Sequence, residues 1–325
     1  MVLLYVFAAL ALLALAITYF AWRVTFFSSS RQRQGYGELP KGDQYKNGRK
    51  LMLSLISDLG EWPYESVETA AVDGIRLFGR YYHVRDGAPV QLQMHGYRGD
   101  AIRDFCGGAK LARQLGMNIL LVDQRAHGRS GGKAITFGIR ERYDCQTWTR
   151  YIYMRFGPET PIYLAGVSMG AATVLMAAGL KLPHTVRGII ADCPYSSPEA
   201  IIRKVISDDL HLPAPVVFPF VRLAARLFGN FSLRETSAAE AVSHSDIPAL
   251  LIHGEDDRFV PCGMSAAIAG LCRGPCTFAS FPDAGHGLSY IVDPERYGTL
   301  VADFTGGSPA PGNNGGISDE MLSGR

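Results

Sequence analysis

The chain has 325 residues, of which 47% are hydrophobic, 10% aromatic and 19% charged. This apolar content is enough for a sizeable core, which excludes an intrinsically disordered or a collagen-like chain. The net charge is only +2, from 32 basic and 30 acidic residues, so the composition gives no support to nucleic acid as a partner.

Six cysteines are spread along the chain rather than clustered. Their spacing fits neither a dense disulfide framework nor a Cys-x-x-Cys metal site. We expect mainly buried thiols, because a free cysteine packs as a small apolar side chain. The six are Cys106, Cys145, Cys193, Cys262, Cys272 and Cys276.

Residues 2–22 form an apolar segment without a charged side chain. As a helix the segment would span about 31 Å, which matches the hydrocarbon core of a bilayer. Tyr19 and Trp22 lie near its end, where aromatic rings favour the membrane interface. We expect a single-pass transmembrane anchor. The alternatives are a buried core helix and a cleaved signal peptide, but a basic start and a small-x-small cleavage site are not obvious.

The charges that flank this segment predict its orientation. Arg23, Arg31, Arg33 and Lys41 follow it, whereas only the terminal amine precedes it. Positively charged flanks favour the cytoplasmic side, so we expect the main domain to be cytoplasmic.

The remaining chain divides by composition into three parts. Residues 23–50 are polar, basic and rich in Gly and Ser, which is typical of a linker. Residues 51–304 carry the periodic apolar pattern of one globular domain, and residues 305–325 form a Gly- and Pro-containing tail that we expect to be disordered.

Short apolar runs alternate with amphipathic stretches through the domain, which predicts an α/β fold with helices on both faces of a sheet. The expected strands are 74–83, 90–94, 118–122, 162–167, 186–191, 249–252 and 276–281. The expected helices are 101–115, 141–155, 169–180, 263–271 and 294–304.

A Gly-x-Ser-x-Gly motif, residues 166–170, lies between an expected strand and an expected helix. Such a turn exposes a serine above the sheet edge, and Gly166 and Gly170 let neighbouring backbone pass closely. The motif alone is common in a glycine-rich chain, but its strand and helix context is the one a nucleophile requires. We therefore predict Ser168 as a nucleophile.

A serine nucleophile needs a general base and a carboxylate that orients the base. His286 follows the last expected strand in a Gly-flanked loop and is the predicted base. Asp257 is the predicted carboxylate among three consecutive acids after another strand, with Asp256 as second choice and Asp192 as third.

A Gly-flanked turn follows the expected strand 90–94. We predict that the backbone amides of Tyr97 and Met169 form an oxyanion hole. His95, which precedes Gly96 in this turn, is expected to orient the loop rather than to transfer protons.

These segments together resemble the α/β-hydrolase superfamily over residues 66–304. Residues 163–197 are most similar to serine aminopeptidase-like, prolyl-oligopeptidase-related hydrolases, which bacteria often carry behind one N-terminal membrane segment. The resemblance implies an α/β-hydrolase fold with a mostly parallel central sheet. The matching segments are HGYRG (95–99), DQRAHGRSGG (123–132), GVSMG (166–170), HGEDDRFVP (253–261) and AGHG (284–287).

The family pattern agrees in part with the residue choices above. Its HG-x-x-D-x-x-VP segment places the aspartate at Asp257, whereas the loop of residues 123–132 departs from the family at Ala126 and His127. Asp123, Arg125 and Ser130 are expected to structure this loop. Residues 198–245 separate two strands by an unusually long connection, which resembles a helical cap over the site. Its apolar segment 212–228 is interpreted as ordinary cap packing, an acyl pocket or a membrane-facing lid.

The expected function is that of a membrane-anchored serine hydrolase that cleaves an ester, thioester or amide bond through an acyl-enzyme. The expected partners are a small-molecule or peptide substrate and, through residues 2–22, the lipid bilayer; no metal, organic cofactor or nucleic acid is expected. Two alternatives stay open: acyl transfer to an acceptor other than water, and a noncatalytic binding protein with a hydrolase fold.

Overall fold

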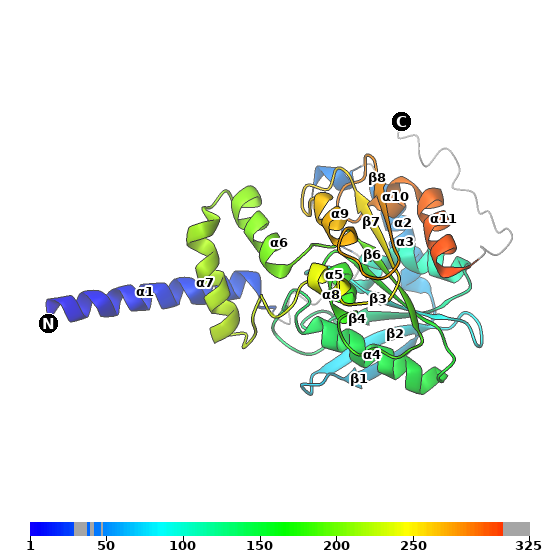
Figure 1. Cartoon of the computed structure of the whole chain (residues 1–325), viewed down its shortest axis with the longest axis horizontal. Coiled ribbons are helices and arrows are strands. Elements are labelled where there is room, and N and C mark those ends of the chain that lie inside the picture. Colours follow the sequence, from blue (N-terminus) through cyan, green and yellow to red (C-terminus); the bar gives the residue numbers. More distant parts are fainter. Residues whose placement is uncertain (29–37, 40–41, 47, 308–325) are drawn as a thin grey trace.

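The computed structural model describes residues 1–28, 38–39, 42–46 and 48–307 of the chain. Arg31, Arg33, Lys41 and residues 308–325 of the predicted tail lie outside these ranges. A long N-terminal helix, α1 (Val2–Thr25), projects from a domain built on one sheet (Figure 1).

The sheet has eight strands in the order β1-β2-β4-β3-β5-β6-β7-β8. The pairs β1·β2 and β2·β4 are antiparallel, and every other neighbouring pair is parallel. The carboxyl ends of the parallel strands therefore meet at one edge. The strands are β1 (Glu65–Ala70), β2 (Arg76–Tyr82), β3 (Val90–Met94), β4 (Asn118–Asp123), β5 (Ile162–Val167), β6 (Val186–Asp192), β7 (Ala249–Gly254) and β8 (Cys276–Phe281).

Helices pack on both faces of the sheet, as alternating side chains require. In β4, Leu120 and Val122 join one apolar cluster, while Ile119 and Leu121 join the cluster on the opposite face. The first cluster includes side chains from α4 (Glu141–Phe156), α5 (Met169–Ala177) and α9 (Gly263–Ala269). The second includes side chains from α2 (Arg49–Glu61), α3 (Ala101–Gln114) and α11 (Pro294–Thr305).

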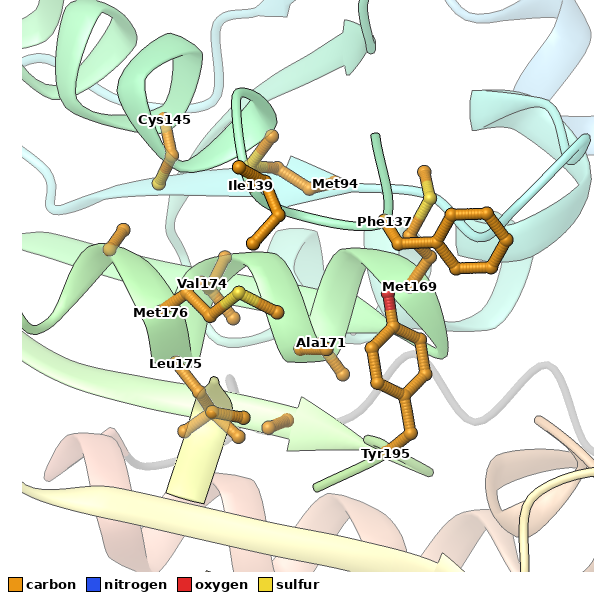
Figure 2. Close-up of a cluster of buried hydrophobic side chains, with 14 of the residues drawn as sticks. Met94, Phe137, Ile139, Cys145, Met169, Ala171, Val174, Leu175, Met176 and Tyr195 are labelled. Atoms are coloured by element: carbon orange, nitrogen blue, oxygen red, sulfur yellow. The ribbon is translucent and has the colours of Figure 1, made fainter. Parts of the chain in front are cut away.

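Helix α5 is apolar on every side because it lies inside the first cluster, and all of its residues are buried. Figure 2 shows the α5 side chains between the loop that carries Phe137 and Ile139 and the ring of Tyr195. Both rings lie at the Met169 end of the helix. This packing holds the start of α5 in one position.

The long connection between β6 and β7 forms a helical insert, but among the described residues none of this insert lines the cavity that holds Ser168, so a cap over the site stays a prediction. It contains α6 (Pro198–Lys204), a π-helical turn (Val205–Asp209), α7 (Ala214–Leu227) and α8 (Ala238–Val242). In Figure 1, α6 and α7 stand apart from the sheet, and α7 crosses α1. A short helix, α10 (Ser289–Val292), follows the His286 loop.

Several elements were missed from the sequence, among them β1 and α2. Strand β1 lies at the sheet edge, and only one of its six side chains is buried, so it has no clear alternation. Helix α2 begins inside the expected linker and packs on α3. All six cysteines are free thiols, three of them buried and three half-buried.

The expected linker, residues 23–50, also contacts the domain at its start. Phe27 forms a β-bridge with Ala134, and Ile135 donates a backbone hydrogen bond to Phe26 O (2.8 Å). The Phe26 ring is fully buried, with its centroid 5.8 Å from that of Phe137 and 5.3 Å from that of Phe231. Residues 26 and 27 are thus part of the folded domain, while the division into anchor, linker and tail otherwise stays a prediction.

Replacing Phe26 by alanine is expected to lower the free energy of unfolding by about 3 kcal/mol, because it removes a fully buried ring. Chemical unfolding of the full chain in detergent measures the change. The neighbouring Val24→Ala is the control, since Val24 is 49% exposed and should change stability by less than about 0.5 kcal/mol. Equal effects of the two substitutions would contradict the docking of residue 26.

Candidate active site

Ser168 lies at the sharp turn between β5 and α5. Its backbone has φ +56° and ψ −116°, a positive-φ conformation that residues other than glycine rarely adopt. Its amide donates to Asp192 O at 2.8 Å, which ties the turn to the end of β6. This is the strained strand-to-helix geometry that presents a serine hydroxyl above a sheet.

The two motif glycines allow this turn to approach its neighbours. A Cβ on Gly170 would lie 1.8 Å from the carbonyl oxygen of Met94, and one on Gly166 would lie 2.3 Å from the backbone of Gly170. Both distances are far below van der Waals contact. Any larger residue at either position would displace β3 or α5.

His286 joins the serine to a carboxylate. Its Nε2 lies 2.9 Å from Ser168 Oγ, and its Nδ1 lies 2.6 Å from Asp257 Oδ2. An imidazole protonated at Nδ1 donates to Asp257 and accepts the Ser168 hydroxyl proton at Nε2. The three side chains come from the ends of β5, β7 and β8, which explains how residues 118 positions apart meet.

Asp257 is held in its charged form. Burial would raise the pKa of this carboxyl, but hydrogen bonds from His253 and His286 outweigh burial and place the pKa below its ordinary value. The amides of Phe259 and Val260 also donate to Oδ1, at 2.9 and 2.8 Å. An anionic carboxylate stabilises an imidazolium at His286.

The other two candidate acids, Asp256 and Asp192, differ in their exposure to solvent. Asp256 is exposed on the same loop. Asp192 is buried, lines the same cavity as Ser168, and has its Oδ1 3.4 Å from Ser289 Oγ. Burial raises the pKa of Asp192 to about 6, although the nearby His253 and His286 oppose the rise.

The loop after β3 lies beside the serine. His95 is fully buried, and its Nε2 accepts a hydrogen bond from Gln124 N at 3.1 Å, which joins two loops. Gly96 N donates to Asp104 Oδ2 at 2.8 Å. These contacts position the loop. The backbone amide of Tyr97, the next residue in the chain, takes no part in them.

Tyr97 and Met169 were predicted to offer backbone amides. Tyr97 lines the cavity with Ser168, and Met169 is the first residue of α5. Among the residues that the structure describes, neither amide donates a hydrogen bond to another protein group. Two free N–H groups, one of them at a helix N-terminus, fit an oxyanion hole.

The loop of residues 123–132 forms a separate network. Arg125 makes hydrogen bonds of 2.6 Å to both oxygens of Asp144 and binds Asp73 at 2.9 Å. Ser130 Oγ donates to Asp123 O at 2.5 Å. His127, where the sequence departs from the family pattern, accepts from Arg98 N at 3.0 Å. The contact between His127 and Arg98 joins this network to the loop that carries Tyr97.

The cavity above Ser168 has a volume of about 350 Å³, within the range of small-molecule sites. Sequence reasoning missed several of its residues. Gln44 Oε1 accepts from His286 N at 3.2 Å, and the Phe259 ring lies 5.1 Å from the His286 ring. Gln44 lies in no motif and Phe259 occupies a variable position of the HG-x-x-D-x-x-VP segment, so neither contact had a sequence signal. The missed lining residues include Gln44, Tyr45, Arg103, Asp104, Phe259 and Tyr290.

One group of possible metal ligands exists among the described residues. Single ligand atoms of Cys193, Asp257 and His286 lie within 4.8 Å of one another. Burial raises the pKa of the Cys193 thiol well above its ordinary value, which disfavours the thiolate that a metal binds. Asp257 and His286 are already joined to each other, so the group does not fit a metal site well.

Comparison with known proteins gives this geometry a family context. The family model for serine aminopeptidase S33 matches residues 92–245. Uncharacterized protein YqkD of Bacillus subtilis is 28% identical over 58% of this chain and 62% of its own length. Thiohydrolase aneE of Aspergillus aculeatus is 31% identical over 48% of this chain and 49% of its own length.

A solved structure shows the same fold. The Pyrococcus furiosus esterase Pf2001 superposes with a TM-score of 0.61 and 21% identity, covering 77% of this chain and 92% of the esterase. The described part of this chain thus has the mostly parallel sheet, flanking helices and insert that the sequence predicted.

Replacing Asp192 by asparagine is expected to move the acid limb of the pH profile for the reaction of Ser168 with a fluorophosphonate to lower pH, by about half a unit. The Asp192 carboxyl has a pKa of about 6, so above that pH it places a negative charge near His286, and asparagine removes that charge. Asp256→Asn, at the exposed neighbouring acid, is the control and should leave the profile unchanged. A shift of Asp192→Asn to higher pH would contradict the charge interaction.

Proposed function

We propose that this chain, which has the α/β-hydrolase fold and matches the serine aminopeptidase S33 model over residues 92–245, is a membrane-anchored serine hydrolase that cleaves an ester, thioester or amide bond. The observation that carries the proposal is the chain of contacts from Ser168 through His286 to Asp257, with distances of 2.9 and 2.6 Å. A buried carboxylate, an imidazole and a strained serine in this order are what nucleophilic acyl transfer requires.

In the first half of the reaction, Ser168 Oγ attacks the carbonyl carbon while His286 Nε2 takes the hydroxyl proton. The negative charge that develops on the carbonyl oxygen is bound by the amides of Tyr97 and Met169. The tetrahedral intermediate collapses, the bond to the leaving group breaks, and His286 gives its proton to the departing alcohol, thiol or amine. An acyl-Ser168 ester remains.

In the second half, water enters and His286 takes one of its protons as the oxygen attacks the acyl carbon. Collapse of the second tetrahedral intermediate releases the carboxylic acid and returns the proton to Ser168 Oγ. Asp257 stays ionised and stabilises the imidazolium in both halves. The low pKa of its carboxyl supports this role.

Membrane anchoring is proposed for α1. Its most apolar window has a mean hydropathy of 2.5, and only 6% of that window is buried against the rest of the chain. A helix this apolar and this exposed is unfavourable in water and favourable in a bilayer. The domain would then face the cytoplasm, as the basic residues after the helix favour.

The decisive variant is Ser168→Ala. It is expected to abolish hydrolysis of short p-nitrophenyl esters and labelling by a fluorophosphonate, because no other residue in the mechanism forms the covalent bond. Gel fluorescence and ester turnover of the full chain in detergent measure both. Asp257→Asn should keep the fold and lower kcat about 1,000-fold or more, since the base loses its orienting charge.

The control is Ser289→Ala, which removes a neighbouring hydroxyl that binds Asp192 rather than His286. It should label and turn over as the parent does. Labelling of Ser168→Ala at the parent rate would overturn the nucleophile assignment. A parent protein that neither labels nor hydrolyses any ester, thioester or amide would favour a noncatalytic binding protein.

A further inference from the structure

The cap helix α7 carries two apolar faces instead of one. Phe218, Val221 and Ala225 are buried, and α7 packs on α1 and α6. A second set, Val216, Phe220, Leu223 and Leu227, repeats at intervals of four, three and four residues and therefore lies along another side of the helix. We call this set the outer stripe of α7.

The outer stripe is open to solvent in the isolated chain. Val216 is 61% exposed, Leu223 43% and Leu227 57%, while Phe220 is half-buried. A cap helix that faces water on this side would carry polar residues there. Arg222 and Arg226 lie on a third side, next to the stripe. This combination of an apolar stripe and flanking arginines is typical of helices that lie in a membrane interface.

The position of α7 relative to α1 indicates what covers the outer stripe. Phe228, directly after α7, packs on Tyr19 and Trp22 of α1, with ring centroids 5.5 and 6.3 Å apart. Figure 1 shows α7 running across α1, with the N-terminal part of α1 extending beyond it. Tyr and Trp side chains favour the headgroup level of a bilayer, so α7 crosses α1 at that level.

Hydrogen bonds and apolar packing fix the domain to the end of α1, so the position of α7 relative to α1 is fixed as well. Tyr97 Oη donates to Thr25 O and Arg98 Nη2 donates to Val24 O, both at 2.8 Å, where the last carbonyls of a helix lack intrahelical partners. The buried Phe26 ring adds an apolar contact. A bilayer that surrounds α1 would therefore meet α7 at a fixed place.

We propose that the outer stripe of α7 is immersed in the interface of the lipid bilayer that α1 enters. The proposal rests on the membrane anchoring proposed above and adds a second, in-plane contact. The exposed Arg226 lies at the level of the lipid phosphates, whereas Arg222 is paired with Glu199 at 3.7 Å. Helix α7 is then held at the membrane surface.

Tryptophan placed in the stripe tests the contact. The full-length Leu223→Trp variant is reconstituted into vesicles of phosphatidylcholine and phosphatidylglycerol, with and without brominated acyl chains, and its emission is compared with that of the parent. The fluorescence added by the new residue is expected to fall by about half or more in brominated vesicles. Met154→Trp, at an 80% exposed site in α4, is the control and should not be quenched.

Washing the vesicles with alkaline carbonate separates the two proposals. If the protein stays in the membrane but Leu223→Trp is not quenched, the α7 contact is wrong and the anchor stands. If the protein is released, the anchor is wrong and the α7 contact falls with it. Unquenched emission that shifts with protein concentration would assign the stripe to a second copy of the chain. Leu227→Trp repeats the test should Leu223→Trp fold poorly.

Discussion

The turn at Ser168 is the constraint on which the site depends. The turn is possible only because Gly170 passes within atomic contact of the Met94 carbonyl, a place with no room for a Cβ. Tight packing of the α5 side chains then holds the helix against the sheet. The serine hydroxyl, the α5 amides and the loop after β3 are brought to one point by this single close approach. A stable core is thus a requirement of the chemistry.

The charges of the two buried acids beside His286 depend on how many hydrogen bonds offset their burial. Asp257 and Asp192 are both buried beside His286, yet the first carries four hydrogen bonds and has a lowered pKa, whereas the second has few partners and a raised one. Two like charges near one imidazole would be costly if both were fully ionised. The different hydrogen bonding of the two acids keeps Asp257 charged and lets Asp192 titrate.

Local pattern was enough to predict most of the parallel sheet and the three residues that meet at its edge. Strands β3, β5 and β8 lie where they were predicted. The strands β3 and β5 are largely buried, as parallel strands covered on both faces are, whereas β8 is an edge strand with two buried side chains. The edge strand β1 escaped because it is largely exposed. Gln44 beside His286, and residues 24–27 beside Tyr97 and Arg98, escaped because contacts between distant segments leave no periodic signal.

The attachment of α1 has a consequence for how the enzyme can be handled. Removing the first 28 residues is an obvious route to a water-soluble form, but the last of these residues pack against the domain. Their loss would leave the pocket between Phe137 and Phe231 empty and would free the side chains of Tyr97 and Arg98. Because those two residues line the cavity beside Ser168, a shortened chain would carry a less constrained loop there. Helix α1 is, in this sense, a structural part of the site.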